Sequence, residues 1–190
     1  MQVLGISGSL RGGSHNTALL RCAGSLLDAE GAELEIYGGL KAMPPYDADD
    51  DGPDAPGAVT AMRAAVVAAD AIVFATPEYN SSVPGQLKNA IDWLSRPIAT
   101  NVLRNKPVAV VGASTGMFGA VWAQAELGKV LAATGARVVG GELPVPQAHE
   151  RFDEEGRLND SELEQALAAV VRSLVEEMRP VPEESATSTA

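Results

Sequence analysis

The sequence predicts a doubly wound α/β sandwich of three layers, with a five-stranded parallel sheet in the order 2-1-3-4-5 between two layers of helices. Short apolar runs alternate along the chain with amphipathic helical patterns, as in α/β folds. Residues 71–75 are apolar at every position, which is typical of a parallel strand covered on both faces. Right-handed crossovers make the sheet parallel, and this order brings the three most polar loops, those after strands 1, 3 and 4, to one crevice.

The hydrophobic pattern places each element along the chain. We expect strands at about residues 3–7, 34–37, 71–75, 108–112 and 137–140. We expect helices at about residues 16–30, 58–69 and 120–134, another opened by Pro84, and a last one ending near Met178. Gly31 ends the first helix, and Ser161 with Glu164 predicts a capping box for the last.

Length and composition limit the function classes. The 190 residues, 46% of them apolar, predict one domain over residues 1–179 and a disordered tail over 180–190, rich in Pro, Glu, Ser and Thr. The net charge of −11 argues against nucleic acid and anionic membrane as partners. No apolar run is long enough to span a bilayer, and no signal peptide is evident. The single cysteine, Cys22, fits a reducing compartment. We therefore expect a cytoplasmic protein.

The first loop, residues 8–17, carries the strongest functional signal. It joins an apolar strand directly to a helix, whose N–H groups and dipole favour an anion. Arg11 adds a positive charge suited to a phosphate. Short polar side chains surround it, namely Ser9, Ser14, Asn16 and Thr17. Ser14 or Asn16 is expected to cap the helix, but capping alone leaves Arg11 and the number of hydroxyls unexplained.

The motifs that the sequence lacks limit the kinds of phosphate ligand that this loop could bind. The sequence has no Walker loop, and no Gly-x-Gly-x-x-Gly follows its first strand. A single phosphate monoester fits better, and FMN is the common cofactor of that kind on an open parallel sheet. An acidic run that imitates a calcium loop, with Asp47, Asp49 and Asp51, has Ala58 where the motif needs its last carboxylate, so we expect no metal.

Two motifs resemble the NADPH-dependent FMN reductase family, the flavodoxin-like group of quinone, chromate and azo-dye reductases. One is the first loop, residues 8–16. The other is the run Pro77-Glu78-Tyr79-Asn80-Ser81-Ser82-Val83-Pro84-Gly85-Gln86-Leu87-Lys88-Asn89-Ala90-Ile91-Asp92-Trp93. The resemblance covers roughly residues 1–146 and implies a flavodoxin-like fold that binds FMN.

The resemblance also implies a set of cofactor-binding residues. The phosphate would contact Ser9, Arg11, Ser14, Asn16 and Thr17. The isoalloxazine ring would lie beside Pro77, Glu78, Tyr79 and Asn80, with Ser114, Thr115 and Gly116 on its other side. The helix with Lys88, Asn89, Asp92 and Trp93 would form a homodimer interface. Some members pair dimers into tetramers, but the charged residues that they use between dimers are not evident around residues 120–126.

The implied activity is hydride transfer from NADPH or NADH to FMN, and then electron transfer to a small acceptor such as a quinone, another flavin, a metal oxyanion or oxygen. Flavin carries this chemistry, so no catalytic side chain is expected. We therefore expect Glu78 to have a structural role rather than that of a base, and we expect Tyr79 to stack near the ring. His15 is expected to be an exposed turn residue.

Two other functions are compatible with the fold. One is a flavodoxin-like electron carrier without NAD(P)H activity of its own. The phosphate loop argues against it, because flavodoxins typically carry a Thr/Ser-rich loop without an arginine, whereas this loop contains Arg11. The other is a scaffold that has lost FMN, which the intact loops disfavour.

Overall fold

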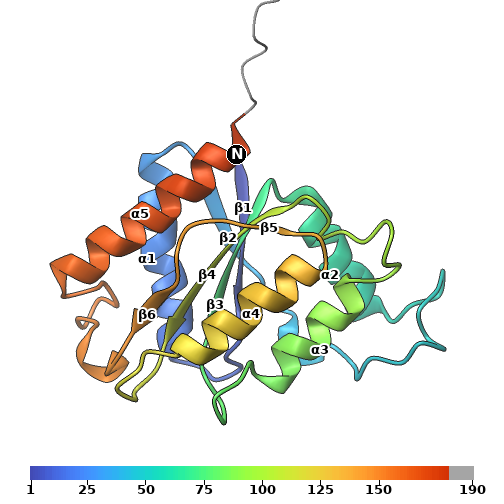
Figure 1. Cartoon of the computed structure of the whole chain (residues 1–190), viewed down its shortest axis with the longest axis horizontal. Helices are drawn as coiled ribbons and strands as arrows, with labels where there is room; N and C mark the ends of the chain where they lie inside the picture. The colour runs from blue at the N-terminus through green and yellow to red at the C-terminus, as the bar shows by residue number, and fades with distance from the viewer. Residues whose placement is uncertain (180–190) are drawn as a thin grey trace, which may run out of the picture.

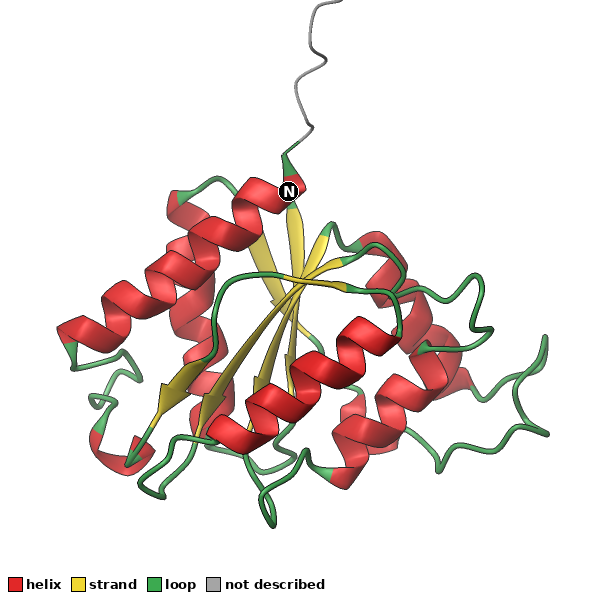
Figure 2. Ribbon diagram, in the orientation of Figure 1, coloured by secondary structure: helices red, strands yellow, loops and turns green. Residues whose placement is uncertain are grey.

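A twisted parallel sheet runs through the middle of the protein, with helices on both of its faces (Figures 1 and 2). The computed structural model describes residues 1–179, so the predicted disordered tail lies outside the described residues. The strands are β1 (Gln2–Ser7), β2 (Glu33–Ile36), β3 (Ala71–Thr76), β4 (Pro107–Ala113), β5 (Arg137–Val138) and β6 (Leu143–Val145). The helices are α1 (His15–Ala29), α2 (Gly57–Ala68), α3 (Gly85–Leu94), α4 (Val121–Ala133) and α5 (Ser161–Met178), with short 3₁₀ turns at Leu40–Ala42 and Ala148–Glu150.

The sheet order β2-β1-β3-β4-β5 confirms the predicted topology, and every strand pair is parallel. Two cores lie on the two faces of the sheet. Alternate residues of β3, such as Ile72 and Phe74, pack with α2, α3 and α4. The residues between them, such as Val73, pack with α1 and α5. Because both faces of β3 are buried, its sequence is apolar throughout.

The fifth strand, expected at about residues 137–140, is confirmed at Arg137–Val138 but is shorter than predicted, and a sixth strand that was not predicted follows it. β5 pairs only with the start of β4, and the chain then leaves the sheet around Gly140, where φ is +69°. It returns as β6, which pairs with the end of β4. The buried side chain of Gln124 lies at this interruption and accepts a hydrogen bond from the Leu143 N–H, 2.9 Å away. A side-chain amide thus takes part of the pairing that a longer strand would have made.

The predicted capping box of the last helix was also wrong, by one residue. Asp160 is the N-cap, and its carboxylate accepts hydrogen bonds from the N–H groups of Glu162 and Leu163 at 3.0 and 3.2 Å. Asp160 also pairs with Arg151 at 3.1 Å, which holds it in place. The C-terminal glycine of α1 is confirmed, because Gly31 has a φ of +77°.

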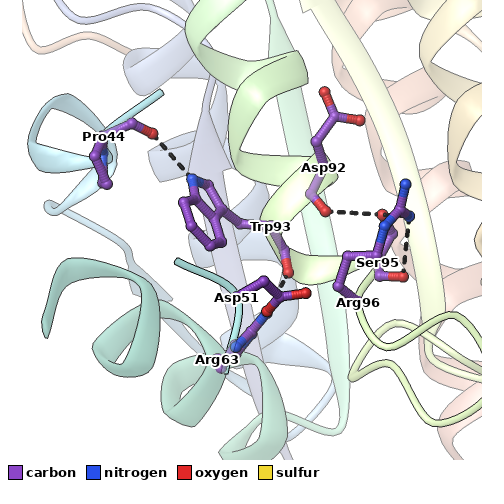
Figure 3. A network of polar contacts seen from close by, with 7 residues as sticks. All are labelled: Pro44, Asp51, Arg63, Asp92, Trp93, Ser95 and Arg96. Atoms are coloured by element: carbon purple, nitrogen blue, oxygen red, sulfur yellow. Dashed lines mark hydrogen bonds and ion pairs between the residues drawn. The ribbon is translucent and has the colours of Figure 1, made fainter. Parts of the chain in front are cut away.

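The acidic loop before α2 is held by side chains of α2 and α3 (Figure 3). The buried Trp93 donates its indole N–H to the Pro44 carbonyl at 2.9 Å. Arg63 bonds both the Asp51 carboxylate and the Trp93 carbonyl at 2.8 Å. Asp51 therefore pairs with a guanidinium, and Trp93 belongs to the core of this chain. No cluster of three metal-ligating side chains occurs within residues 1–179.

No helix within the described part of the chain combines the length and the apolar character needed to cross a bilayer.

Candidate functional site

The loops that follow β1, β3 and β4 meet at the carboxyl end of the sheet and line a cavity of about 240 Å³. This is the crevice that the strand order predicts. The predicted residues that line it are Ser9, Arg11, Ser14, Asn16, Pro77, Glu78, Tyr79, Ser114 and Thr115. Thr17, Asn80 and Gly116 lie outside its lining, while His15 and Ala113 line it without having been predicted.

The first loop ends at the N-terminus of α1, as its sequence indicates. Ser14 is the N-cap, and its hydroxyl accepts hydrogen bonds from the N–H groups of Asn16 at 3.2 Å and Thr17 at 3.4 Å. Arg11 is exposed and makes no ion pair with any acidic side chain among residues 1–179. An unpaired guanidinium beside a helix N-terminus is suited to bind a phosphate.

Asn16 joins the first loop to the end of β4. Its buried side-chain amide donates to the Ala113 carbonyl and accepts from the Ala113 N–H, each at 2.9 Å. Thr17 bonds through its hydroxyl to the Ser7 hydroxyl at 3.2 Å. These two residues therefore fix the shape of the loop. The local sequence did not reveal that the buried Asn16 amide would bond a distant strand.

His15 is partly buried, so the prediction of an exposed turn histidine was wrong. Its ring stacks on Phe152, with ring centroids 5.7 Å apart. Burial lowers the pKa of His15 below its ordinary value of 6.5, and the charges of Arg11 and His149 lower this pKa further. The imidazole at the cavity wall is therefore neutral at pH 7.

The second loop begins with a tight hairpin. Tyr79 and Ser82 exchange two backbone hydrogen bonds, of 3.1 and 3.2 Å, around a two-residue turn. Asn80 and Ser81 occupy the turn with φ values of +53° and +58°. Both central residues have positive φ, as a type I′ turn requires. The turn leaves the Tyr79 side chain exposed at the edge of the cavity.

Two glutamates join this hairpin to α4. Glu78 accepts hydrogen bonds from the N–H groups of Trp122 and Ala123, at 3.0 and 3.1 Å. Its carboxylate thus replaces the cap that Ala120, the N-cap residue, lacks. In return, Glu126 accepts from the Ser82 hydroxyl at 2.6 Å, and this bond lowers the pKa of Glu126. We call Glu78 and Glu126 the carboxylate brace. These contacts agree with the structural role expected for Glu78.

The third loop is fixed by its own backbone and by the chain around β6. The Ser114 hydroxyl accepts from the Gly116 N–H at 3.1 Å, and the Gly116 carbonyl accepts from the Gln147 N–H at 3.0 Å. Gly119 has a φ of +59°, and a Cβ there would lie 2.7 Å from the backbone nitrogen of Val145. Only glycine fits this approach, which sets the direction in which the loop enters α4.

The donors in the crevice fit a phosphorylated flavin. The first loop supplies hydroxyls, the N-terminus of α1 and the Arg11 guanidinium, which has no acidic partner among residues 1–179. Tyr79, Ser114 and Thr115 supply uncharged side chains elsewhere in the lining. A phosphate at the helix N-terminus and a planar ring between the second and third loops would therefore each meet suitable groups.

Comparison with known proteins shows which families share these features. A family model described as NADPH-dependent FMN reductase matches residues 1–150. An NAD(P)H-dependent FMN reductase from Pseudomonas aeruginosa is 40% identical over 92% of this chain and 93% of its own length. A quinone reductase from Escherichia coli K12 is 39% identical over 73% of each chain. The solved structure of FerB, a flavoenzyme NAD(P)H:(acceptor) oxidoreductase from Paracoccus denitrificans, is 32% identical and covers 93% of this chain and 96% of its own, with a TM-score of 0.81.

Proposed function

Because the chain belongs to the NADPH-dependent FMN reductase family, we propose that its crevice is the site at which NAD(P)H and a small electron acceptor meet bound FMN. The protein is an FMN-dependent oxidoreductase of the NAD(P)H:quinone reductase type. FMN bound in the crevice would supply the hydride and electron chemistry that links NAD(P)H to the acceptor. The electron-carrier alternative is set aside, because the relatives that cover most of the chain are reductases.

The first loop is the proposed phosphate site. The observation that carries this proposal is Arg11, an exposed guanidinium at the N-terminus of α1 that has no acidic partner among residues 1–179. Ser9 and Ser14 would add hydroxyls, while Asn16 and Thr17 would keep the loop in shape through their bonds to Ala113 and Ser7. The protein is strongly acidic overall, so this isolated cation would dominate the attraction of a phosphate.

The hairpin and the third loop are the proposed walls of the flavin ring site. Both line the cavity, and both have their backbones fixed by hydrogen bonds. Glu78 is already bonded to two N–H groups of α4, which supports a positioning role for it rather than that of a base. The protein would then bind and orient the flavin and exclude water, without a catalytic side chain.

Substitution of Arg11 tests the phosphate site. We expect Arg11→Ala to raise the Kd of the apoprotein for FMN about 10- to 150-fold, because a charge-assisted bond to phosphate contributes about 1.5–3 kcal/mol. Quenching of flavin fluorescence during titration measures this Kd. Arg21→Ala is the matched control, because it removes the same charge from an exposed position on α1. Equal Kd values for the two variants would contradict the assignment of Arg11.

We also propose that residues 1–179 form one FMN-binding domain and that the protein is cytoplasmic.

We propose further that the protein forms a homodimer through the outer face of α3. Lys88 and Asp92 are surface residues that pair with each other at 2.8 Å, and Ile98 just beyond α3 is highly exposed. Trp93 and Asn89 are engaged within the chain, so they would not contact the partner directly. Light scattering of Ile98→Asp against the native protein tests this interface, since an unchanged dimer mass would contradict it.

A further inference from the structure

His15 lies in the wall of the crevice, beside the proposed phosphate site. It lines the same cavity as Ser9, Arg11 and Ser14. It is the first residue of α1 and directly follows the N-cap Ser14. A phosphate held by Arg11 at this helix N-terminus would therefore also lie close to the imidazole.

A short hairpin over residues 151–159 holds the His15 ring in place. The ring stacks on Phe152, with centroids 5.7 Å apart and 16° between the ring planes, and Phe152 is itself paired across the hairpin. Two turns further along α1, the Cys22 thiol donates to the Gly156 carbonyl in the hairpin at 3.4 Å. The hairpin is thus attached to α1 at two points, so the imidazole has a defined position at the cavity wall.

The charged groups around His15 come from three other parts of the chain. Arg11 belongs to the first loop, and His149 belongs to the 3₁₀ turn before the hairpin, where it lies 3.4 Å from Glu150. Glu78, in the second loop, is the acidic residue of the cavity lining, but its carboxylate already accepts two N–H groups of α4. α1 has no acidic residue in its first turn. No carboxylate among residues 1–179 therefore forms an ion pair with His15.

The charged side chains of the hairpin have partners of their own. Arg151 pairs with Asp160 at the start of α5, and Arg157 pairs with Asp153 and Glu155 inside the hairpin. These charges are therefore largely balanced, and the net charge next to the imidazole is that of Arg11 and His149.

A phosphate among these groups would change the protonation of His15. Burial lowers the pKa of the imidazole, and the positive charges of Arg11 and His149 lower it further. An anion in the cavity would offset the repulsion from both neighbours. A phosphate monoester carries about −1.5 to −2 charges at pH 7, and an opposite charge within about 4–6 Å favours the charged form of a titratable group by about 1–3 pH units.

We propose that His15 is a second cation of the phosphate site, and that its imidazole takes up one proton from solvent when the FMN phosphate binds. This inference rests on the proposed function and assigns a further residue to its phosphate site. The imidazole is neutral beside Arg11 in the apoprotein and becomes positive beside the phosphate. The site thus gains positive charge only when the anion is present to balance it.

Proton uptake by His15 determines how FMN affinity depends on pH. The FMN complex binds more protons than the apoprotein, so a lower pH favours the complex. The phosphate of free FMN itself gains a proton near pH 6, which acts in the opposite direction in every variant. The contribution of His15 is therefore the ratio of the Kd of His15→Gln to that of the native protein at the same pH.

The direct test is the pKa of His15 in the native protein, measured by NMR from the C2 proton of the imidazole. The chain contains two histidines, so the signal that is missing in His15→Gln identifies His15. Saturation of the apoprotein with FMN should raise the pKa of His15 by about 1–3 pH units. This measurement needs neither turnover nor a variant that folds well.

Calorimetry measures the same proton in the binding reaction. FMN is titrated into the apoprotein at pH 6.5 in two buffers that lack phosphate and sulfate and differ in ionisation enthalpy, which gives the number of protons taken up. The native protein should take up more protons than His15→Gln, by a substantial fraction of one. The ratio of the two Kd values should also grow by at least about 3-fold between pH 8 and pH 6. His149→Gln is the matched control and should retain the uptake, because the His15 imidazole remains.

The outcomes separate this inference from the proposed function. A pKa of His15 that does not change on saturation with FMN would overturn the inference, and so would equal proton uptake in the native protein and His15→Gln. Uptake that is lost in His149→Gln but kept in His15→Gln would overturn it as well, because the proton would then belong to His149. In each of these cases FMN still binds, and its bleaching by NADPH would still support the reductase. A native protein that binds no FMN would contradict the proposed function and this inference with it.

Discussion

His15 shows how one residue of the site depends on distant parts of the chain. The sequence places it in the phosphate loop, and its position at the start of α1 follows from the cap formed by Ser14. Its burial does not follow from any local pattern, because Phe152, on which it stacks, enters after β6. Ser14 was predictable because an N-cap needs only its own helix. His15 was not, because its environment is a tertiary contact.

The lowered pKa of His15 predicts a pH dependence of stability. In the unfolded chain this imidazole takes up a proton near its ordinary pKa of 6.5, whereas the folded protein resists the proton until a lower pH. The unfolded state therefore binds more protons, and the free energy of unfolding decreases, so the protein becomes less stable, as the pH drops from about 7 towards 5. We expect His15→Gln to weaken this fall in the apoprotein, as measured by urea unfolding at several pH values.

His149→Gln is the matched control for this measurement. His149 lies close enough to lower the pKa of His15, but its own ring is exposed beside Glu150. If the two glutamine variants respond to pH alike, His15 is not the group responsible.

At the scale of secondary structure, most elements were predictable because periodicity decides them. α1 to α4, β1, β3 and β4 lie within a few residues of their predicted positions. β6 was missed because it is three residues long and follows the glycines that interrupt the fifth strand. The cap of α5 was misassigned because Asp160 and Ser161 are both good caps. The extended backbone of Asp160 and its contact with Arg151 decide between them.

The carboxylate brace gives a prediction at this scale. α4 begins without a side-chain cap of its own, and Glu78 supplies one from another element. We expect Glu78→Ala to lower the free energy of unfolding by about 1 kcal/mol, the usual contribution of an N-cap. Glu78→Gln keeps an oxygen that accepts hydrogen bonds and should cost less. Chemical denaturation of the two apoproteins measures both values.

The carboxylate brace also links the stability of the fold to cofactor binding. A residue that only capped α4 would not provide this link. Glu78 belongs to the hairpin that lines the cavity, so freeing it should loosen the hairpin as well as α4. We therefore expect Glu78→Ala to weaken FMN binding to the apoprotein in the same titration used for Arg11. A variant that is destabilised but binds FMN with native affinity would show that the hairpin does not depend on the brace.

At the scale of the whole molecule, the crevice was predictable from topology. Once the strand order is 2-1-3-4-5, the loops after β1, β3 and β4 must end at one edge of the sheet, and their polar residues meet there. The exposure of Met117, Phe118 and Trp122 was not predictable in this way, because the hydrophobic pattern does not show which apolar side chains the packed fold leaves uncovered.

The most direct test of the central claim is an absorbance spectrum of the purified protein, supplemented with FMN and then mixed with NADPH in the absence of air. An FMN-dependent reductase shows the bands of oxidised flavin, and these bands bleach when NADPH is added and return when a quinone follows. Flavin bands that neither NADPH nor NADH bleaches would contradict the reductase and indicate an electron carrier. A protein that shows no bound flavin even with added FMN would contradict the assignment of the crevice.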